Sequence, residues 1–359
     1  MEASSKIVVF IGSYAEASDH GVYACLFDRE TGSLELSDQV KGLQNPTFLD
    51  VDTEGLKLYA LTEELSPEGK RRGAAAAFDI DPDRITLTPL NKETTVQSTT
   101  CHIVLDRSRQ NLIVSSYHGG MVGVSPLLEG GKIGITADVH QHEGSSVLPV
   151  QNQPRVHSAF IDLSGRFAAV CDLGLDRVFI YKLDPEAPKL VPHGAVSVEP
   201  GAGPRHFAFH PTLPYGYVIN ELNSTITSFS YDEERGNLEV LDTVSTLPDS
   251  YEGDNACADI HISPDGKFLY GSNRGHDSIA VYAIDPDKGK LSIVEYAPTL
   301  GGHPRNFAIS PDGRFLLAAN RDSNQIVTFV RDAATGRLQP NGHTLEVSKP
   351  VCLKFVSLP

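Results

Sequence analysis

The sequence predicts an all-β protein with the architecture of a seven-bladed β-propeller, four antiparallel strands to a blade. A pair of short apolar strands joined by a turn of the Ser-Pro-Asp-Gly type recurs along the chain. Successive copies begin 46 to 55 residues apart, a period typical of propeller blades. No helical periodicity of useful length interrupts the copies.

Six copies of the strand pair begin near residues 45, 99, 154, 202, 256 and 302. The clearest turns are Ser263-Pro264-Asp265-Gly266 and Ser310-Pro311-Asp312-Gly313, each followed by an apolar strand. The copy near residue 99 is the weakest. A third strand follows most copies, for example at residues 279–283 and 326–330, and a Gly-x-Leu turn then opens a fourth. Each copy therefore predicts one four-stranded blade.

The two ends of the chain predict the seventh blade. Residues 6–14, 21–27 and 33–37 resemble strands two to four without a first strand, and residues 349–355 resemble a first strand alone. Joining them closes the ring by hydrogen bonds between the chain ends. We therefore expect a single domain over residues 1–359, although the length alone would allow two or three domains.

Composition narrows the function. The chain has 46 acidic and 30 basic residues, a formal net charge of −16, which is unfavourable for binding nucleic acid. No run of 18 apolar residues predicts a membrane span, and residues 1–6 lack the basic start of a secretory signal. The five cysteines include no Cys-x-x-Cys pair, which favours buried, reduced thiols. We expect a cytoplasmic protein.

Strand register predicts where a site must lie. Strand one is innermost and strand two runs antiparallel to it, so the start of one and the end of the other share an edge. Seven such edges surround one mouth of the central channel. The residues at these positions include Tyr14, Thr47, Glu63, Cys101, His102, Tyr117, His157, Arg205, His206, Asn220, Glu221, Asp259, Arg274, Arg305 and Arg321.

This mouth gathers several arginines and histidines, although the protein as a whole is acidic. Polar residues at strand ends often only cap turns, and that explanation suffices for single Asn and Thr residues. It explains a local basic cluster less well, so we expect a pocket for an anionic small molecule. Two long connections, residues 142–154 and 248–255, are either flaps over this mouth or surface decoration.

Metal and nucleotide signals are weak. His140 and His142 share a strand face, as any residues two apart do in a strand, and do not by themselves indicate a metal site. Asp259 and His261 share a face in the same way, and we expect a buried hydrogen bond between them that orients the blade. No glycine pair precedes a helix, and no Gly-x-Ser-x-Gly elbow is present. We expect neither a metal nor a cofactor.

Several stretches resemble the seven-bladed β-propeller lactonase family over the full length of the chain. The most specific is Gly201-Ala-Gly-Pro-Arg-His-Phe-Ala-Phe-His-Pro211. Residues 258–270 and 303–307 also resemble the family. The family includes the propeller-type 6-phosphogluconolactonase and the fungal 3-carboxy-cis,cis-muconate lactonizing enzyme. The second blade departs from the family pattern at residues 100–102 and 107–109, and the third has Arg155-Val156-His157 where members often carry paired histidines.

The resemblance implies roles for residues at the mouth. In the muconate enzyme a His, two Arg and a Glu have been proposed to act, and by motif they resemble His157, Arg205, Glu221 and Arg274 here. We expect His157 as the base that activates water, Glu221 orienting it or sharing proton transfer, and Arg205 with His206 stabilising the oxyanion or a substrate carboxyl. Arg274 and Arg305 would hold a phosphate or carboxylate, with Asp259, Asn220 and His102 as further binding or supporting residues.

Three function classes remain open at this point. The first is a sugar lactonase acting on 6-phospho-D-glucono-1,5-lactone, which serves the pentose phosphate pathway. The second is a carboxymuconate cycloisomerase, and the third a propeller that only binds a ligand or protein. The third class would favour a large exposed apolar or aromatic face, and the chain has no Trp. A closed ring leaves few strand edges, so a monomer is expected.

Overall fold

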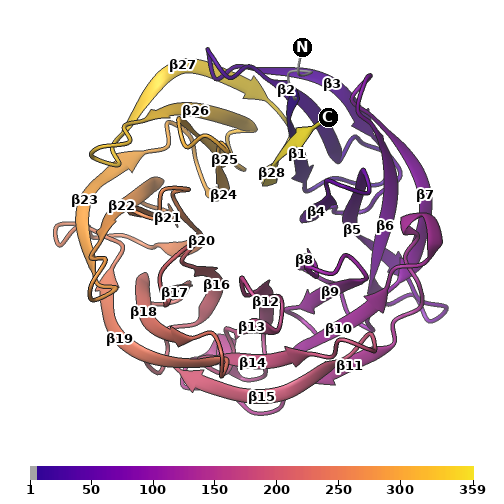
Figure 1. Ribbon diagram of the computed structural model, residues 1–359, viewed down its shortest axis with the longest axis horizontal. Coiled ribbons are helices and arrows are strands. Elements are labelled where there is room, and N and C mark those ends of the chain that lie inside the picture. Colours follow the sequence, from indigo (N-terminus) through magenta and orange to yellow (C-terminus); the bar gives the residue numbers. More distant parts are fainter. Residues whose placement is uncertain (1–5) are drawn as a thin grey trace.

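Seven four-stranded antiparallel sheets follow one another around a central channel in the computed structural model, which describes residues 6–359 (Figure 1). The predicted propeller is confirmed, with each predicted blade forming one sheet. The N-terminal residues 1–5, on which part of the secretory-signal expectation rests, lie outside the described residues. The two helices in residues 6–359 are the single 3₁₀ turns η1 (Glu129–Gly131) and η2 (Pro149–Gln151), and neither could span a membrane.

Six blades use consecutive strands, innermost strand first. They are β4 (Leu49–Asp52), β5 (Lys57–Leu65), β6 (Arg71–Asp81), β7 (Thr86–Thr94); β8 (His102–Leu105), β9 (Asn111–Ser116), β10 (Met121–Pro126), β11 (Asp138–Gln141); β12 (Val156–Ile161), β13 (Phe167–Asp172), β14 (Arg177–Leu183), β15 (Leu190–Ser197); β16 (Pro204–Phe209), β17 (Tyr215–Asn220), β18 (Thr225–Asp232), β19 (Asn237–Ser245); β20 (Ala256–Ile262), β21 (Phe268–Arg274), β22 (Ser278–Ile284), β23 (Leu291–Pro298); β24 (Pro304–Ile309), β25 (Phe315–Asn320), β26 (Gln325–Arg331), β27 (Leu338–Glu346).

The seventh blade joins the two ends of the chain, as expected. The C-terminal β28 (Pro350–Leu358) is its innermost strand, followed by β1 (Lys6–Ser13), β2 (Val22–Phe27) and β3 (Leu34–Val40). The antiparallel ladder between β28 and β1 runs from Lys6 opposite Leu358 to Ser13 opposite Pro350. This ladder closes the ring by hydrogen bonds between the two ends of the chain.

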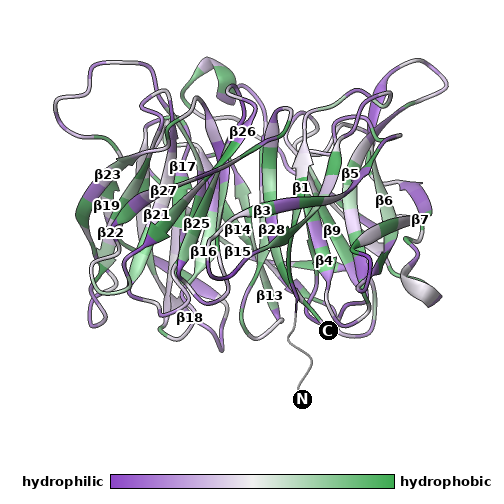
Figure 2. Cartoon of the chain, turned by 90° about the horizontal axis from the view of Figure 1, so that it is seen from above, coloured by the Kyte–Doolittle hydropathy of each residue, from purple (hydrophilic) through white to green (hydrophobic). Residues whose placement is uncertain are grey.

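The repeated turns explain why the strand pairs form. In the turn between β20 and β21, the N–H of Gly266 donates to the carbonyl of Ser263 at 2.8 Å, and the Ser263 hydroxyl accepts from the N–H of Phe268 at 3.0 Å. Gly266 has φ +71°, which glycine adopts without the strain that a Cβ would impose. The turn at Ser310–Gly313 repeats these bonds. Hydrophobic residues follow many of the strands through the ring, and hydrophilic residues are frequent in the turns at both faces (Figure 2).

Candidate active site

The inner strands carry an irregularity at the predicted mouth. Pairing shifts register between Val156 and Ser158 in β12, between Pro204 and His206 in β16, and between Pro304 and Asn306 in β24. Bulges of this kind release one residue from the ladder and turn its side chain in a new direction. The released residues are His157, Arg205 and Arg305, so the bulges explain how an apolar strand presents a polar side chain at the mouth.

A pocket of about 240 Å³ lies at this mouth. At ~30 Å³ per water its volume equals about eight waters, which suits one small molecule. Its wall is formed by Tyr14, Thr47, Glu63, Thr99, Thr100, Cys101, Tyr117, His118, His157, Glu221 and Arg305. Most of these positions follow from strand register. Thr99, Thr100 and His118 do not, because they belong to connections beyond the strand ends and the repeat does not define their position.

Glu221 lines the pocket and joins two buried arginines that do not. Its Oε2 lies 2.9 Å from Nε of Arg205 and 2.9 Å from a terminal nitrogen of Arg274. Arg205 also donates to the carbonyl of Ala258, and Arg274 to the carbonyls of Ala256 and Cys257 at 3.1 and 2.6 Å. Arg274 is therefore largely occupied by the protein, whereas the sequence suggested that it would hold a substrate anion.

The charges of Glu221, Arg205 and Arg274 shift one another's pKa values. Burial alone raises the pKa of Glu221, but the charges of Arg274, Arg205 and Arg305 outweigh it and hold the pKa below its usual value. Burial, with the nearby charges of Arg305 and Arg274, lowers the pKa of Arg205 to about 9. Three arginines against one glutamate leave a local charge of +2 in an acidic protein, which favours an anionic ligand.

Arg305 is the cation that the protein leaves available. Its guanidinium stands 5.7 Å from the centre of the Tyr14 ring, and both residues line the pocket. Within residues 6–359 it forms no ion pair and no hydrogen bond with the protein. A half-buried guanidinium of this kind is suited to a phosphate or carboxylate of the ligand.

His157 lines the same pocket and comes from a different blade, in strand β12. It is 4 % exposed, and its Nδ1 is buried without a hydrogen-bond partner among the described residues. Burial, followed by the charge of Arg205, holds the pKa of His157 well below its usual value, so the ring is neutral near pH 7. Glu221 pairs with Arg205 and Arg274, and no hydrogen bond joins it to His157 among the described residues, so its orienting His157 or sharing proton transfer stays a prediction.

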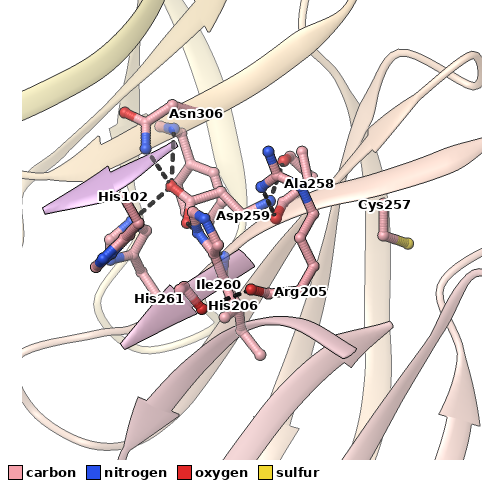
Figure 3. A network of polar contacts seen from close by, with 12 residues as sticks. His102, Arg205, His206, Cys257, Ala258, Asp259, Ile260, His261 and Asn306 are labelled. Carbon is pink, nitrogen blue, oxygen red and sulfur yellow. Dashed lines mark hydrogen bonds and ion pairs between the residues drawn. The ribbon is translucent and has the colours of Figure 1, made fainter. Parts of the chain in front are cut away.

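Behind the pocket, His206 and Asp259 form a buried pair (Figure 3). The Nδ1 of His206 lies 2.7 Å from Oδ1 of Asp259, and both side chains are almost fully buried. The other carboxylate oxygen of Asp259 accepts from Asn306 at 2.5 Å and lies 2.9 Å from Nε2 of His261. The expected bond between Asp259 and His261 is present, although His261 is half-exposed.

Two other predicted residues do not reach the pocket wall. The Asn220 amide donates to the hydroxyls of Thr225 and Thr227 at 2.9 and 3.0 Å, and so supports its own blade. His102 packs in the channel against Phe48 and Phe160, with ring centres 4.3 and 4.9 Å apart. Neither residue lines the pocket, although the count of residues along the strands placed both at the mouth.

The two long connections are fastened to the blades. In residues 142–154, the buried Gln151 side chain donates to the carbonyl of Leu173 at 2.9 Å and to the Asp176 carboxylate at 2.7 Å. In residues 248–255, the Asn255 amide donates to Ser224 at 2.9 Å. Neither connection supplies a residue to the pocket wall.

His142 has a structural partner rather than a metal-site geometry. Its Nδ1 lies 2.7 Å from Asp172 and its Nε2 lies 2.9 Å from the Tyr181 hydroxyl. Among residues 6–359, no three His, Cys, Asp or Glu side chains are grouped as metal ligands. All five cysteines are free, and four are buried, whereas Cys101 borders the pocket.

A larger hollow of about 770 Å³ adjoins the pocket and shares Tyr14 with it. Its wall includes Lys41, Arg321 and Lys349 together with Glu16, Asp19 and Asp322. Its opposite charges are balanced, and none of His157, Glu221 and Arg305 lines it. The smaller pocket is therefore the candidate active site.

Comparison with known proteins agrees with this architecture. The family described as Lactonase, 7-bladed beta-propeller matches residues 8–355. The chain is 33% identical to a 6-phosphogluconolactonase of Bacillus subtilis, covering 98% of this chain and 99% of that protein. It is 37% identical to a 6-phosphogluconolactonase of Formosa agariphila, covering 84% of this chain and 85% of that protein.

A solved structure is equally similar. A periplasmic gluconolactonase of Pseudomonas aeruginosa superimposes with a TM-score of 0.91 at 31% identity, covering 99% of this chain and all of that one. These similarities confirm the expected enzyme over the alternative of a propeller that only binds a ligand or protein. The protein is a lactone-hydrolysing enzyme, a carboxylic ester hydrolase, and the chain belongs to the family of seven-bladed β-propeller lactonases.

Proposed function

We propose that this protein hydrolyses 6-phospho-D-glucono-1,5-lactone to 6-phosphogluconate in the pocket between His157 and Arg305. One observation carries the proposal: a neutral imidazole and a guanidinium without a protein partner line the same small pocket. A lactone with an anionic group away from its carbonyl would react at the imidazole and bind its anion at the guanidinium. The names of the two bacterial 6-phosphogluconolactonases support the choice of lactone.

In the proposed reaction, His157 takes a proton from a water molecule as the water oxygen attacks the lactone carbonyl. Arg205, paired with the lining residue Glu221, contributes positive potential where the oxyanion develops. His157 then returns the proton to the leaving alkoxide as the ring C–O bond breaks. Arg305 holds the phosphate and so positions the ring. Glu221 keeps the buried Arg205 and Arg274 charged and fixed in place.

A panel of lactones tests the substrate. Proton release is followed in a pH-stat for glucono-1,5-lactone, its 6-phosphate and a carboxymuconolactone, each against its own spontaneous rate. The proposal expects the largest kcat/KM for the 6-phosphate. Preference for the unphosphorylated sugar lactone would assign another sugar substrate, and turnover of the muconolactone alone would favour the cycloisomerase reaction.

We further propose that the protein works as a monomer in the cytoplasm. The five free cysteines suit a reducing compartment, and the closed ring places the inner edge strand of every blade at the central channel, away from a partner protein. The similar protein from Pseudomonas aeruginosa is named periplasmic, so the compartment needs a direct test. Cell fractionation and light scattering on the purified chain distinguish these outcomes.

A further inference from the structure

Three buried imidazole nitrogens lack partners among the described residues, and two of them lie on neighbouring rings at the channel wall. These two are Nδ1 of His157 and Nε2 of His206, and the third is Nε2 of His303. The rings of His157 and His206 lie 5.3 Å apart between centres, inclined at 67°. A buried polar atom without a partner costs free energy, and unpaired atoms of this kind in a native structure commonly mark a bound water or a catalytic role. The unpaired atoms of His157 and His206 belong to one pair of neighbouring rings.

The tautomers of the two rings are complementary. Asp259 is ionised, because contacts from His261 and His206 outweigh the burial that raises its pKa. Its carboxylate at 2.7 Å therefore fixes the His206 proton on Nδ1 and leaves Nε2 as an acceptor. A base at His157 needs its Nε2 lone pair toward the pocket, which places the proton on Nδ1. His157 thus offers a donor where His206 offers an acceptor.

We propose that His206 and Asp259 form a proton relay behind His157. The inference rests on the proposed function, in which His157 is the base. His206 and Asp259 do not line the pocket, so they act through His157 as positioning residues. This differs from the sequence-based expectation that His206 would meet the oxyanion or substrate carboxyl directly.

Every proton in the relay is accounted for. As water attacks the carbonyl, a water O–H bond breaks and its proton joins Nε2 of His157. The proton on Nδ1 of His157 passes to Nε2 of His206, directly or through one water, and His206 becomes an imidazolium beside the Asp259 carboxylate. Return of both protons lets His157 protonate the leaving alkoxide. The hydroxy acid then loses its proton to solvent.

The surroundings of the pair keep the resting state neutral. Burial and the charge of Arg205 lower the pKa of His206 to about 4, against the raising influence of Asp259. His102 lies 5.6 Å from His206 between ring centres, and Lys354 lies beyond it over the Phe48 ring. Asp50 pairs with Lys354 at 3.4 Å.

Asp259 is held in place to serve as the fixed counterion. Asn306 at 2.5 Å and His261 at 2.9 Å hold Oδ2, and the N–H of Ile260 donates to Oδ1 at 3.0 Å. Asp259 therefore cannot turn away from His206 without breaking several bonds. A carboxylate fixed in this manner selects one tautomer of its histidine partner.

Two substitutions test the relay with a matched control. Asp259→Asn keeps the shape but lets an amide N–H face His206, which reverses its tautomer, and His206→Phe keeps a ring but removes the nitrogens. The control is Asp172→Asn, because Asp172 and His142 form a buried pair with the same 2.7 Å separation away from the pocket. Thermal unfolding of each variant establishes that it is folded.

The relay predicts that Asp259→Asn and His206→Phe each lower kcat about 10²-fold, with KM within about threefold of the parent. It also predicts that the acid limb of the pH–kcat profile of Asp259→Asn moves to lower pH. The reason is that this variant lacks the carboxylate that raises the pKa of His206. Asp172→Asn should leave kcat and the limb unchanged. Unchanged kcat in both relay variants would overturn the proposal.

Nitrogen-15 NMR of labelled histidines in the parent protein separates failure of the relay from failure of the proposed function. Signals are assigned with His157→Gln and His206→Phe. The relay requires the Nδ1–H tautomer for both rings near pH 7, with or without turnover. An Nε2–H tautomer at either ring overturns the relay. If these tautomers are present but no lactone is hydrolysed, the proposed substrate and reaction fail instead.

Discussion

The Nε atom of Arg205 lies 2.9 Å from Oε2 of Glu221, and the arginine of this ion pair is almost fully buried. The same oxygen meets Arg274 at 2.9 Å, so one carboxylate neutralises part of the charge of two buried guanidinium groups. Removing a buried partner leaves a charge without compensation, which costs far more than losing an exposed pair.

Glu221→Gln should therefore lower the free energy of unfolding by about 3–5 kcal/mol. The matched control is Glu63→Gln, because Glu63 pairs at 2.5 Å with Arg71, whose side chain is half-exposed. That substitution should cost at most about 1 kcal/mol. Urea unfolding at pH 7 measures both free energies. Equal losses in the two variants would contradict the claim that the buried ion pairs of Glu221 stabilise the fold more than the exposed pair of Glu63.

His157→Gln should lower kcat for the 6-phosphorylated lactone by about 10²-fold or more, because the pocket loses its neutral imidazole base. KM should change little, since Arg305 still binds the phosphate. Stopped-flow measurement of proton release, corrected for spontaneous hydrolysis, checks the change. Parent-like turnover in this variant would remove His157 from the reaction.

Arg305→Met should raise KM for the 6-phosphorylated lactone by about tenfold or more, a loss of about 1.4 kcal/mol in binding. The unphosphorylated lactone has no anion for Arg305, so its kcat/KM should stay within about threefold. Arg305→Lys should recover part of the phosphate preference, because charge remains while the planar fork is lost. An equal loss with both lactones would contradict a phosphate role.

Stability should fall between pH 7 and pH 5. Burial lowers the pKa of His206 and of His303 to about 4, and holds the pKa of His102 and His157 well below the usual value near 6.5. In this window the unfolded chain binds more protons than the folded chain, so acid favours unfolding.

Each of these histidines contributes up to about 1.4 kcal/mol per pH unit to that dependence. Urea unfolding at pH 5, 6 and 7 measures it. His206→Phe should flatten the slope, because one of the neutral buried imidazoles is gone. A parent protein that is equally stable at pH 5 and 7 would mean that these rings titrate alike in both states.

The propeller and its mouth follow from the sequence because both depend on the repeat. Turns such as Ser263–Gly266 define the strand ends, and counting from them places Tyr14, Tyr117, His157, Glu221 and Arg305 at one edge. The pocket wall contains all five. Register is a backbone property, so a regular repeat is enough to predict it.

Side-chain direction and pairing are harder to predict. Asn220 and Glu221 are neighbours in sequence, yet Asn220 bonds within its blade while Glu221 meets arginines from the same blade and the next. The bulges at His157, Arg205 and Arg305 break the simple alternation, and a count of residues does not reveal them. The choice of Arg305 over Arg274 as the available cation depends on the carbonyls that Arg274 meets across the strands.

A crystal structure of the protein with 6-phosphogluconate tests the central claim most directly. The account predicts the phosphate on the Arg305 guanidinium and the new carboxylate within hydrogen-bond reach of His157, inside the 240 Å³ pocket. The product bound instead in the adjoining 770 Å³ hollow, away from both residues, would contradict the account.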